Sequence, residues 1–172
     1  MRQPTGQPVE RHLAEFNFGT LKHDWDDPRV QGFVDGLDLV NGIAAQSPGF
    51  VWRLPDDAMD AAQNDPAGVF GGAARIASTL SVWESAETLE QFVWNTVHRQ
   101  FYARRAEWYD AIGNSHLVLW WVPVGHRPSV AEAMARFKAW QAQGDTDQAF
   151  GWGWLPQAKL WQSRACSGVA AE

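Results

Sequence analysis

The sequence predicts a single α+β domain, and three observations support this class. The chain has 172 residues, a length that suits one hydrophobic core. Hydrophobic residues make up 45% and charged residues 20% of the composition, which is typical of a globular chain and not of a disordered one. Short segments with strand-like alternation of side chains are interspersed with longer segments of helical periodicity.

The first part of the chain is expected to form a strand, a helix and a second strand. Residues 12–21 alternate between two faces and are rich in Phe, which favours a strand. Asp27 and Pro28 suit the N-cap and the first position of a helix that extends to about Gln46. Residues 50–54 then form the second strand. Helical spacing places six apolar residues on one face of the helix: Val30, Phe33, Val34, Leu37, Val40 and Ala44.

The central part is expected to contribute a loop, two strands and a long helix between them. Residues 56–72 follow neither period and are predicted to be a long loop, a type of segment that often carries function. Residues 75–83 alternate and form the third strand. Ser85 is expected to cap a single helix that extends to about Trp108. The strongly apolar residues 116–124 form the fourth strand.

The last part of the domain is expected to add a helix and a strand. Ser129 and Glu132 have the spacing of a capping box, which begins a helix that ends near Gln143. Residues 149–154 are predicted to be an edge strand. The whole order is β-α-β-β-α-β with an extra helix and strand, which is the arrangement of a ferredoxin-like unit.

This topology predicts a homodimer. Right-handed crossovers place both main helices on one face of the sheet, which leaves the other face bare. Trp120 and Trp121 are neighbours in the fourth strand, so one indole lies on each face. Monomers avoid an exposed apolar patch of this kind, so we expect a second copy to cover it in a dimeric α/β barrel. The domain is expected to span residues 12–154, with residues 1–11 and 155–172 as tails.

Composition and charge argue against several classes of function. The formal net charge is −6, and the scattered Lys and Arg residues do not form the basic surface that nucleic-acid binding needs. No apolar run is long enough to span a membrane, and the polar start of the chain does not resemble a signal peptide. The single cysteine, Cys166, fits a reducing compartment. We therefore expect a cytoplasmic protein with no nucleic-acid or membrane partner.

The most unusual feature of the composition is its eleven tryptophans. Each indole brings a large apolar area and one N–H that needs a partner. Two interpretations stay open: a heavily aromatic core, and an aromatic pocket or apolar dimer interface. As walls of a ligand pocket, the candidates are Trp52, Trp83, Trp94 and Trp121.

Four polar or aromatic residues are expected to converge on the sheet. Glu15 and Asn17 share one face of the first strand, and Ser81 and Trp83 share one face of the third. If the two strands are adjacent, these side chains form a polar site on an apolar bed, which suits a small organic ligand. Glu15 is then a candidate for proton transfer. The alternative is a solvated polar face, or one that bridges the dimer.

Two further polar residues lie on the predicted helices. Asn41 falls in the middle of the apolar face of the first helix, where its amide either ties the helix to a strand or lines a ligand pocket. That position faces the sheet, on a side that Glu15 need not share. His98, with Trp94 and Tyr102 one turn away on either side, is a candidate general acid or base. Its alternatives are an axial haem ligand and a half-exposed residue in an aromatic interface.

A resemblance to a known family adds to this interpretation. Six segments in order resemble the bacterial domain-of-unknown-function family 3291: residues 12–20 (HLAEFNFGT), 27–30 (DPRV), 47–52 (SPGFVW), 81–85 (SVWES), 92–98 (FVWNTVH) and 119–128 (LWWVPVGHRP). The resemblance implies a place among the dimeric α/β barrels, beside the antibiotic-biosynthesis monooxygenases. That superfamily includes cofactor-free oxygenases, haem-binding enzymes and proteins without known catalysis, so the fold does not select a function.

Two hypotheses of function follow. The first is a monooxygenase-like enzyme that transforms a small, partly aromatic molecule by cofactor-independent oxidation or isomerisation, with His98 or Glu15 moving a proton. The second is a non-catalytic dimer that holds a metabolite or a protein partner, and haem binding is a further alternative. The other histidines show no paired spacing on one element, so no metal site is predicted.

Overall fold

The computed structural model describes residues 10–110 and 116–156, which form an α+β arrangement around a four-stranded antiparallel sheet. The strand order is β2-β3-β1-β4. The strands are β1 (Arg11–Thr20), β2 (Phe50–Arg53), β3 (Ile76–Trp83) and β4 (Leu117–Pro123). The expected order of strands and main helices along the chain is confirmed.

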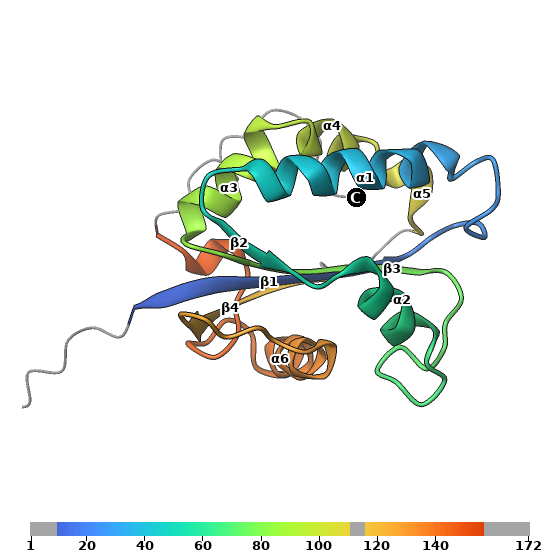
Figure 1. Cartoon of the computed structure of the whole chain (residues 1–172). Helices are drawn as coiled ribbons and strands as arrows, with labels where there is room; N and C mark the ends of the chain where they lie inside the picture. The colour runs from blue at the N-terminus through green and yellow to red at the C-terminus, as the bar shows by residue number, and fades with distance from the viewer. Residues whose placement is uncertain (1–9, 111–115, 157–172) are drawn as a thin grey trace, which may run out of the picture.

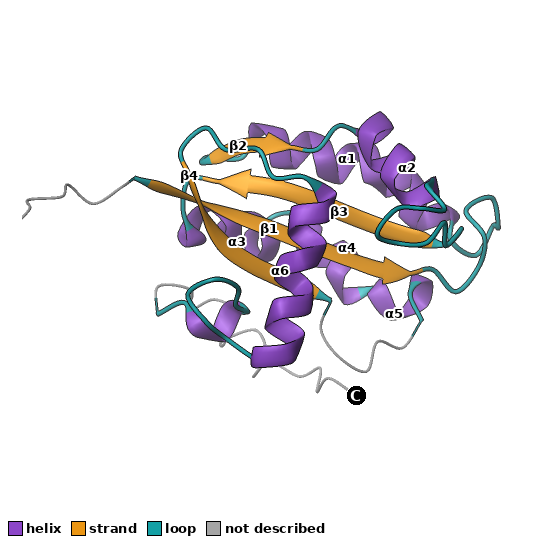
Figure 2. Ribbon diagram, turned by 90° about the horizontal axis from the view of Figure 1, so that it is seen from below, coloured by secondary structure: helices purple, strands orange, loops and turns teal. Residues whose placement is uncertain are grey.

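The described residues include six α-helices, which lie on both faces of the sheet (Figure 1). One face is covered by α1 (Gln31–Gln46), α3 (Ala86–Asn95), α4 (His98–Ala103) and α5 (Arg105–Trp108). The opposite face carries α2 (Asp56–Asn64) and α6 (Val130–Gln143), and α6 crosses in front of the sheet in Figure 2. We call these the α1 face and the α6 face.

The α6 face is not bare, and the expectation that a second copy must cover it is wrong. Val130, Ala133, Met134 and Phe137 of α6 pack against Trp120 and its neighbours in one buried apolar cluster. Trp120 is 0% exposed, and its indole N–H donates to Glu132 at 3.1 Å. The chain therefore buries this sheet face with its own helix α6, whose apolar residues recur at helical spacing.

The first helix begins later than predicted. It starts at Gln31, and Val30 occupies the N-cap position in place of Asp27. The Asp27 carboxylate instead accepts hydrogen bonds from the backbone N–H of Arg29 at 2.9 Å and from its guanidinium. This local bonding holds residues 27–30 in turns that precede the helix.

The predicted helix from Ser85 to Trp108 is three helices. After α3, Thr96 adopts an extended conformation, and its hydroxyl donates to the carbonyl of Phe92 at 2.6 Å. A threonine hydroxyl can bond the carbonyl four residues earlier, and this side-chain hydrogen bond offers the backbone an alternative to continuing the helix. The Ser85 cap itself is confirmed, in a reciprocal capping box with Thr88.

Three other expectations need correction. The stretch 56–72 is not a loop throughout, because it contains α2, which buries only Met59 and Gln63 and so leaves a weak apolar pattern. Residues 149–154 form no strand: Phe150 makes one bridge to Leu119, and Trp152–Trp154 is a 3₁₀ turn. Ser129 caps α6 by accepting from the N–H of Glu132, but the Glu132 carboxylate bonds Trp120 and His126, so the box is not reciprocal.

Two further expectations concern membrane-spanning segments and the ends of the domain. No helix among residues 10–110 and 116–156 is both long enough and apolar enough to cross a membrane. Cys166 and most of the two predicted tails lie outside the described residues.

Candidate functional site

Glu15, Asn17, Ser81 and Trp83 meet on the α1 face, as the alternation of the two strands predicted. Glu15 of β1 pairs with Ser81 of β3 across the sheet. The carboxylate accepts from the side-chain amide of Asn17 and from the Ser81 hydroxyl, whose Oγ lies 2.9 Å from Glu15 Oε2. The Trp83 indole N–H donates to the same Ser81 oxygen at 3.0 Å. We call these four residues the Glu15 cluster.

Burial changes the acidity of the Glu15 carboxyl. The residue is 5% exposed, and loss of water raises its pKa to about 7. The hydrogen bonds from Asn17 and Ser81 act in the opposite direction but are outweighed. Near neutral pH the group therefore exists in both protonation states, which an acid–base catalyst needs.

Aromatic rings extend from the cluster to His98. The Phe92 ring stacks on Trp83 at 5.1 Å between centroids, and the His98 ring lies 5.0 Å from Phe92. The Nδ1 atom of His98 is 3.3 Å from the carbonyl oxygen of Val93. Burial lowers the pKa of His98, so its imidazole is neutral at pH 7. The two candidate proton-transfer groups are thus linked through rings and not through a hydrogen bond.

The other predicted site residues do not join the Glu15 cluster. Asn41 lies half-buried on α1, on the same side of the sheet as Glu15, and makes no side-chain hydrogen bond within the described residues. Trp52 packs into the cluster on the α6 face, so the sheet separates it from Glu15. Trp94 packs on Tyr102, and Trp121 packs on Phe150.

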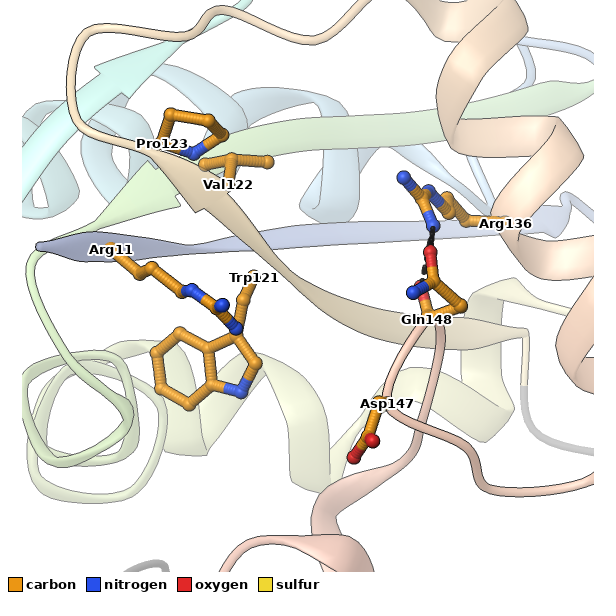
Figure 3. Close-up of a pocket in the computed structure, with 7 residues that line it drawn as sticks. All are labelled: Arg11, Trp121, Val122, Pro123, Arg136, Asp147 and Gln148. Carbon is orange, nitrogen blue, oxygen red and sulfur yellow. Dashed lines mark hydrogen bonds between the residues drawn. The ribbon is translucent and has the colours of Figure 1, made fainter. Parts of the chain in front are cut away.

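Trp121 and Trp94 each line a surface pocket. The first, which we call the β4-edge pocket, has a volume of about 280 Å³ and is shown in Figure 3. Its walls are Arg11, Trp121, Val122, Pro123, Arg136, Asp147 and Gln148. The second, the α4 pocket, measures about 640 Å³ and is lined by Trp94, Asn95, Thr96, Arg99, Gln100 and Ala103. Glu15 lines neither of these two pockets.

The sequence did not point to the arginines of the β4-edge pocket. Arg11 begins β1, and Arg136 lies on α6, 125 positions away in a chain with no motif that joins them. Only the docking of α6 beside β4 places both arginines in the lining of one pocket, where Figure 3 shows Arg11 beside Trp121 and Arg136 beside Gln148.

No group of three or more His, Cys, Asp or Glu side chains in the described part of the chain has an arrangement that holds a metal ion. Glu132 and His126 contact each other at 2.8 Å. The polar chemistry of the candidate site therefore rests on the Glu15 cluster and on the arginines of the pockets.

Comparison with known proteins identifies a family of unknown function. A family described as Domain of unknown function (DUF3291) matches residues 12–166. No curated protein matches the chain. Among solved structures, the chain is similar to the crystal structure of NE2512, a protein of unknown function from Nitrosomonas europaea, at 10% identity and a TM-score of 0.43, over 71% of this chain and 97% of that chain. Because the family match covers most of its length, this protein belongs to the DUF3291 family.

Proposed function

We propose that this protein binds a small, partly aromatic organic molecule on the α1 face and moves a proton on it with Glu15. The observation that carries the proposal is a carboxyl group that is 5% exposed and has a pKa of about 7. Perturbed carboxyls of this kind concentrate at catalytic sites, where they take and return protons at neutral pH.

The neighbours of Glu15 suit that role. Asn17 and Ser81 hold its two oxygens in a fixed orientation, and Trp83 fixes the Ser81 hydroxyl in turn. The stacked and buried rings of Trp83 and Phe92 keep water away from the carboxyl group. A carboxylate in such an apolar site is a stronger base than in water, because desolvation disfavours its charge.

Two reactions use a base of this kind without a cofactor. In isomerisation, the base takes a proton from a carbon next to a carbonyl and returns it to another atom of the same molecule. In cofactor-independent oxidation, the deprotonated substrate reacts with molecular oxygen. Both begin with the same proton abstraction, so one assay addresses both.

The test is hydrogen–deuterium exchange into a panel of enolisable aromatic ketones and phenols, followed by NMR in D₂O. The wild-type protein is expected to accelerate exchange of at least one compound, with a midpoint near pH 7. Glu15→Gln is expected to lose about 10²–10⁴-fold, the usual contribution of a general base. Glu84→Gln, which changes an exposed carboxylate just after β3, is the matched control and is expected to keep the rate. Equal rates in wild type and Glu15→Gln would contradict the proposal.

A non-catalytic binding module is the second candidate. The observation that favours it is that Trp121 and Trp94, two of the proposed ligand residues, line open surface pockets apart from Glu15. A ligand that raises the melting temperature of wild type and Glu15→Gln equally, with no exchange in either, would select this function.

Haem binding is a third and separate proposal, with His98 as the residue that would hold the iron. Its Nδ1 lies 3.3 Å from the Val93 carbonyl oxygen, which would leave Nε2 to hold the iron, since a metal-binding histidine commonly bonds a backbone carbonyl through its other ring nitrogen. A bound haem would supply redox chemistry. Protein from haem-supplemented cells should then show a Soret band that His98→Ala loses, and a colourless wild-type protein would exclude this role.

We also propose a cytoplasmic homodimer built on a ferredoxin-like unit, with a distant relationship to the antibiotic-biosynthesis monooxygenases. The strand order β2-β3-β1-β4 supports the unit. A barrel formed by two sheets face to face is not part of this proposal, because α2 and α6 occupy the face it needs. The surface that we propose for the dimer is the edge strand β2, where Val51 is 38% exposed.

A further inference from the structure

We propose that the β4-edge pocket binds a small organic carboxylate that carries a planar ring. This site is separate from the Glu15 cluster, and the inference does not depend on proton transfer there. Three features carry it: an open strand edge, two arginines that form no ion pair within residues 10–110 and 116–156, and an indole wall.

The pocket forms where a neighbouring segment leaves the edge of β4. Leu119 exchanges two backbone hydrogen bonds with Phe150, at 2.8 and 2.9 Å, so its N–H and C=O point away from β1. Alternation directs the N–H and C=O of Trp121 to the same outer edge. Preceding Phe150, the chain turns at Thr146–Ala149, and no described strand lies opposite Trp121. Since Pro123 has no N–H, Trp121 supplies the last backbone donor of this edge.

The arginines give the pocket a positive charge. Arg11 makes no ion pair or side-chain hydrogen bond within the described residues. Arg136 donates to the backbone carbonyl and the side-chain oxygen of Gln148, at 3.0 and 2.8 Å, and both acceptors are neutral. Asp147 lines the pocket as well, so the lining holds two guanidiniums and one carboxylate. The excess of one positive charge in a chain of net charge −6 suits a monoanion.

The indole of Trp121 favours a ligand with a planar ring. In Figure 3 the Arg11 side chain lies alongside the Trp121 ring, so a ring placed on the indole brings its carboxylate to the guanidinium. Arginine binds carboxylates with two parallel hydrogen bonds, and aromatic faces stack on indoles. The volume of about 280 Å³ lies at the lower end of the range for ligand pockets, which favours a single ring.

The experiment is an NMR titration of the ¹⁵N-labelled full-length protein with benzoate. Saturable shifts are expected at the Trp121 backbone amide and indole N–H, with a dissociation constant on the order of 1 mM. Benzamide tests the charge and cyclohexanecarboxylate tests the planar ring, and each is expected to bind at least about 10-fold more weakly. Inorganic phosphate tests for a simple anion site and is expected to leave the indole signal in place.

Three variants locate the site. Arg11→Gln is expected to weaken benzoate binding by about 10-fold or more, because it removes the free guanidinium. Arg99→Gln, which changes an arginine of the α4 pocket, is the matched control and should bind as wild type does. Glu15→Gln should also bind normally, which separates this site from the Glu15 cluster. No saturable shift at Trp121, unchanged binding in Arg11→Gln, or weakened binding in Arg99→Gln or Glu15→Gln would each overturn the proposal, as would phosphate that binds as tightly as benzoate.

Discussion

The Ser81 hydroxyl oxygen lies 2.9 Å from Oε2 of Glu15, across the pairing of β3 with β1. The same oxygen accepts the indole N–H of Trp83, so one hydroxyl serves a buried carboxyl and a buried indole together. Removal of this hydroxyl therefore deprives Oε2 of Glu15 and the indole N–H of Trp83 of this partner, and both residues are buried.

Ser81→Ala is expected to lower the free energy of unfolding by about 1–3 kcal/mol, the cost of buried polar groups left unpaired. It should also raise the pKa of Glu15 further, since the Ser81 bond favours the charged carboxylate. Urea unfolding measures the first effect. Thr79→Val on the same strand, where the described structure records no side-chain hydrogen bond, is the control and should change stability by less than about 0.5 kcal/mol. Equal stability of both variants would contradict the role of this hydroxyl.

The raised pKa of Glu15 predicts how stability depends on pH. Between the ordinary value of 4.5 and about 7, the native state holds a proton that the unfolded state has released. The contribution of Glu15 to stability is therefore largest below pH 4.5. As the pH rises to about 7, the free energy of unfolding falls by about 3 kcal/mol in total. Urea unfolding of wild type and Glu15→Gln at pH 5 and pH 8 measures the difference. Glu15→Gln should gain stability relative to wild type at the higher pH, and parallel behaviour of the two proteins would disprove the shift.

Two glycines of α1 are expected to respond to alanine in opposite ways. A Cβ at Gly36 would lie 1.9 Å from Cε1 of Phe101, so Gly36→Ala must displace the Phe101 ring from its place against α1. We expect a loss of about 1–3 kcal/mol from this overpacking. At Gly42 a Cβ meets nothing within 4 Å, and Gly42→Ala should stabilise the protein by about 1 kcal/mol through helix propensity. Thermal unfolding of the two variants tests the close contact of α1 with α4. An increase in melting temperature in both variants would contradict this contact.

One hydrogen bond that the sequence does not reveal joins α6 to β4, in addition to their apolar packing. Glu132→Ala removes the acceptor of the fully buried Trp120 indole and should cost about 1–3 kcal/mol. Glu132→Gln keeps an acceptor oxygen and is expected to lose much less. Guanidinium unfolding compares the two, and an equal loss in both would show that the charge, not the hydrogen bond to Trp120, matters.

The proposed dimer predicts a particle of twice the 19.2 kDa chain mass by light scattering. If β2 forms the interface, Val51→Lys should shift the mass towards the monomer without changing the unfolding of the isolated chain. Trp120→Glu is the contrasting variant: it should destabilise the fold itself, because that side chain is buried under α6. A monomer at micromolar concentration would rule out the dimer.

The sequence by itself determined the four strands of the sheet and the composition of the Glu15 cluster. Alternation in β1 and β3 assigned Glu15, Asn17, Ser81 and Trp83 to faces of two strands, and strand geometry then leaves little freedom in where they meet. Capping at Ser85 and Ser129 likewise marked where α3 and α6 begin, since a cap depends on residues within one turn.

Only the tertiary structure decided what lies against the sheet. The apolar residues of α6 were visible as a pattern, but a pattern does not state which surface a helix covers, so the α6 face was expected to be bare. The pKa of Glu15 and the presence of Arg11 and Arg136 in one pocket have the same origin. Desolvation and the assembly of charges depend on segments far apart in the chain, whereas periodicity and capping report only on near neighbours.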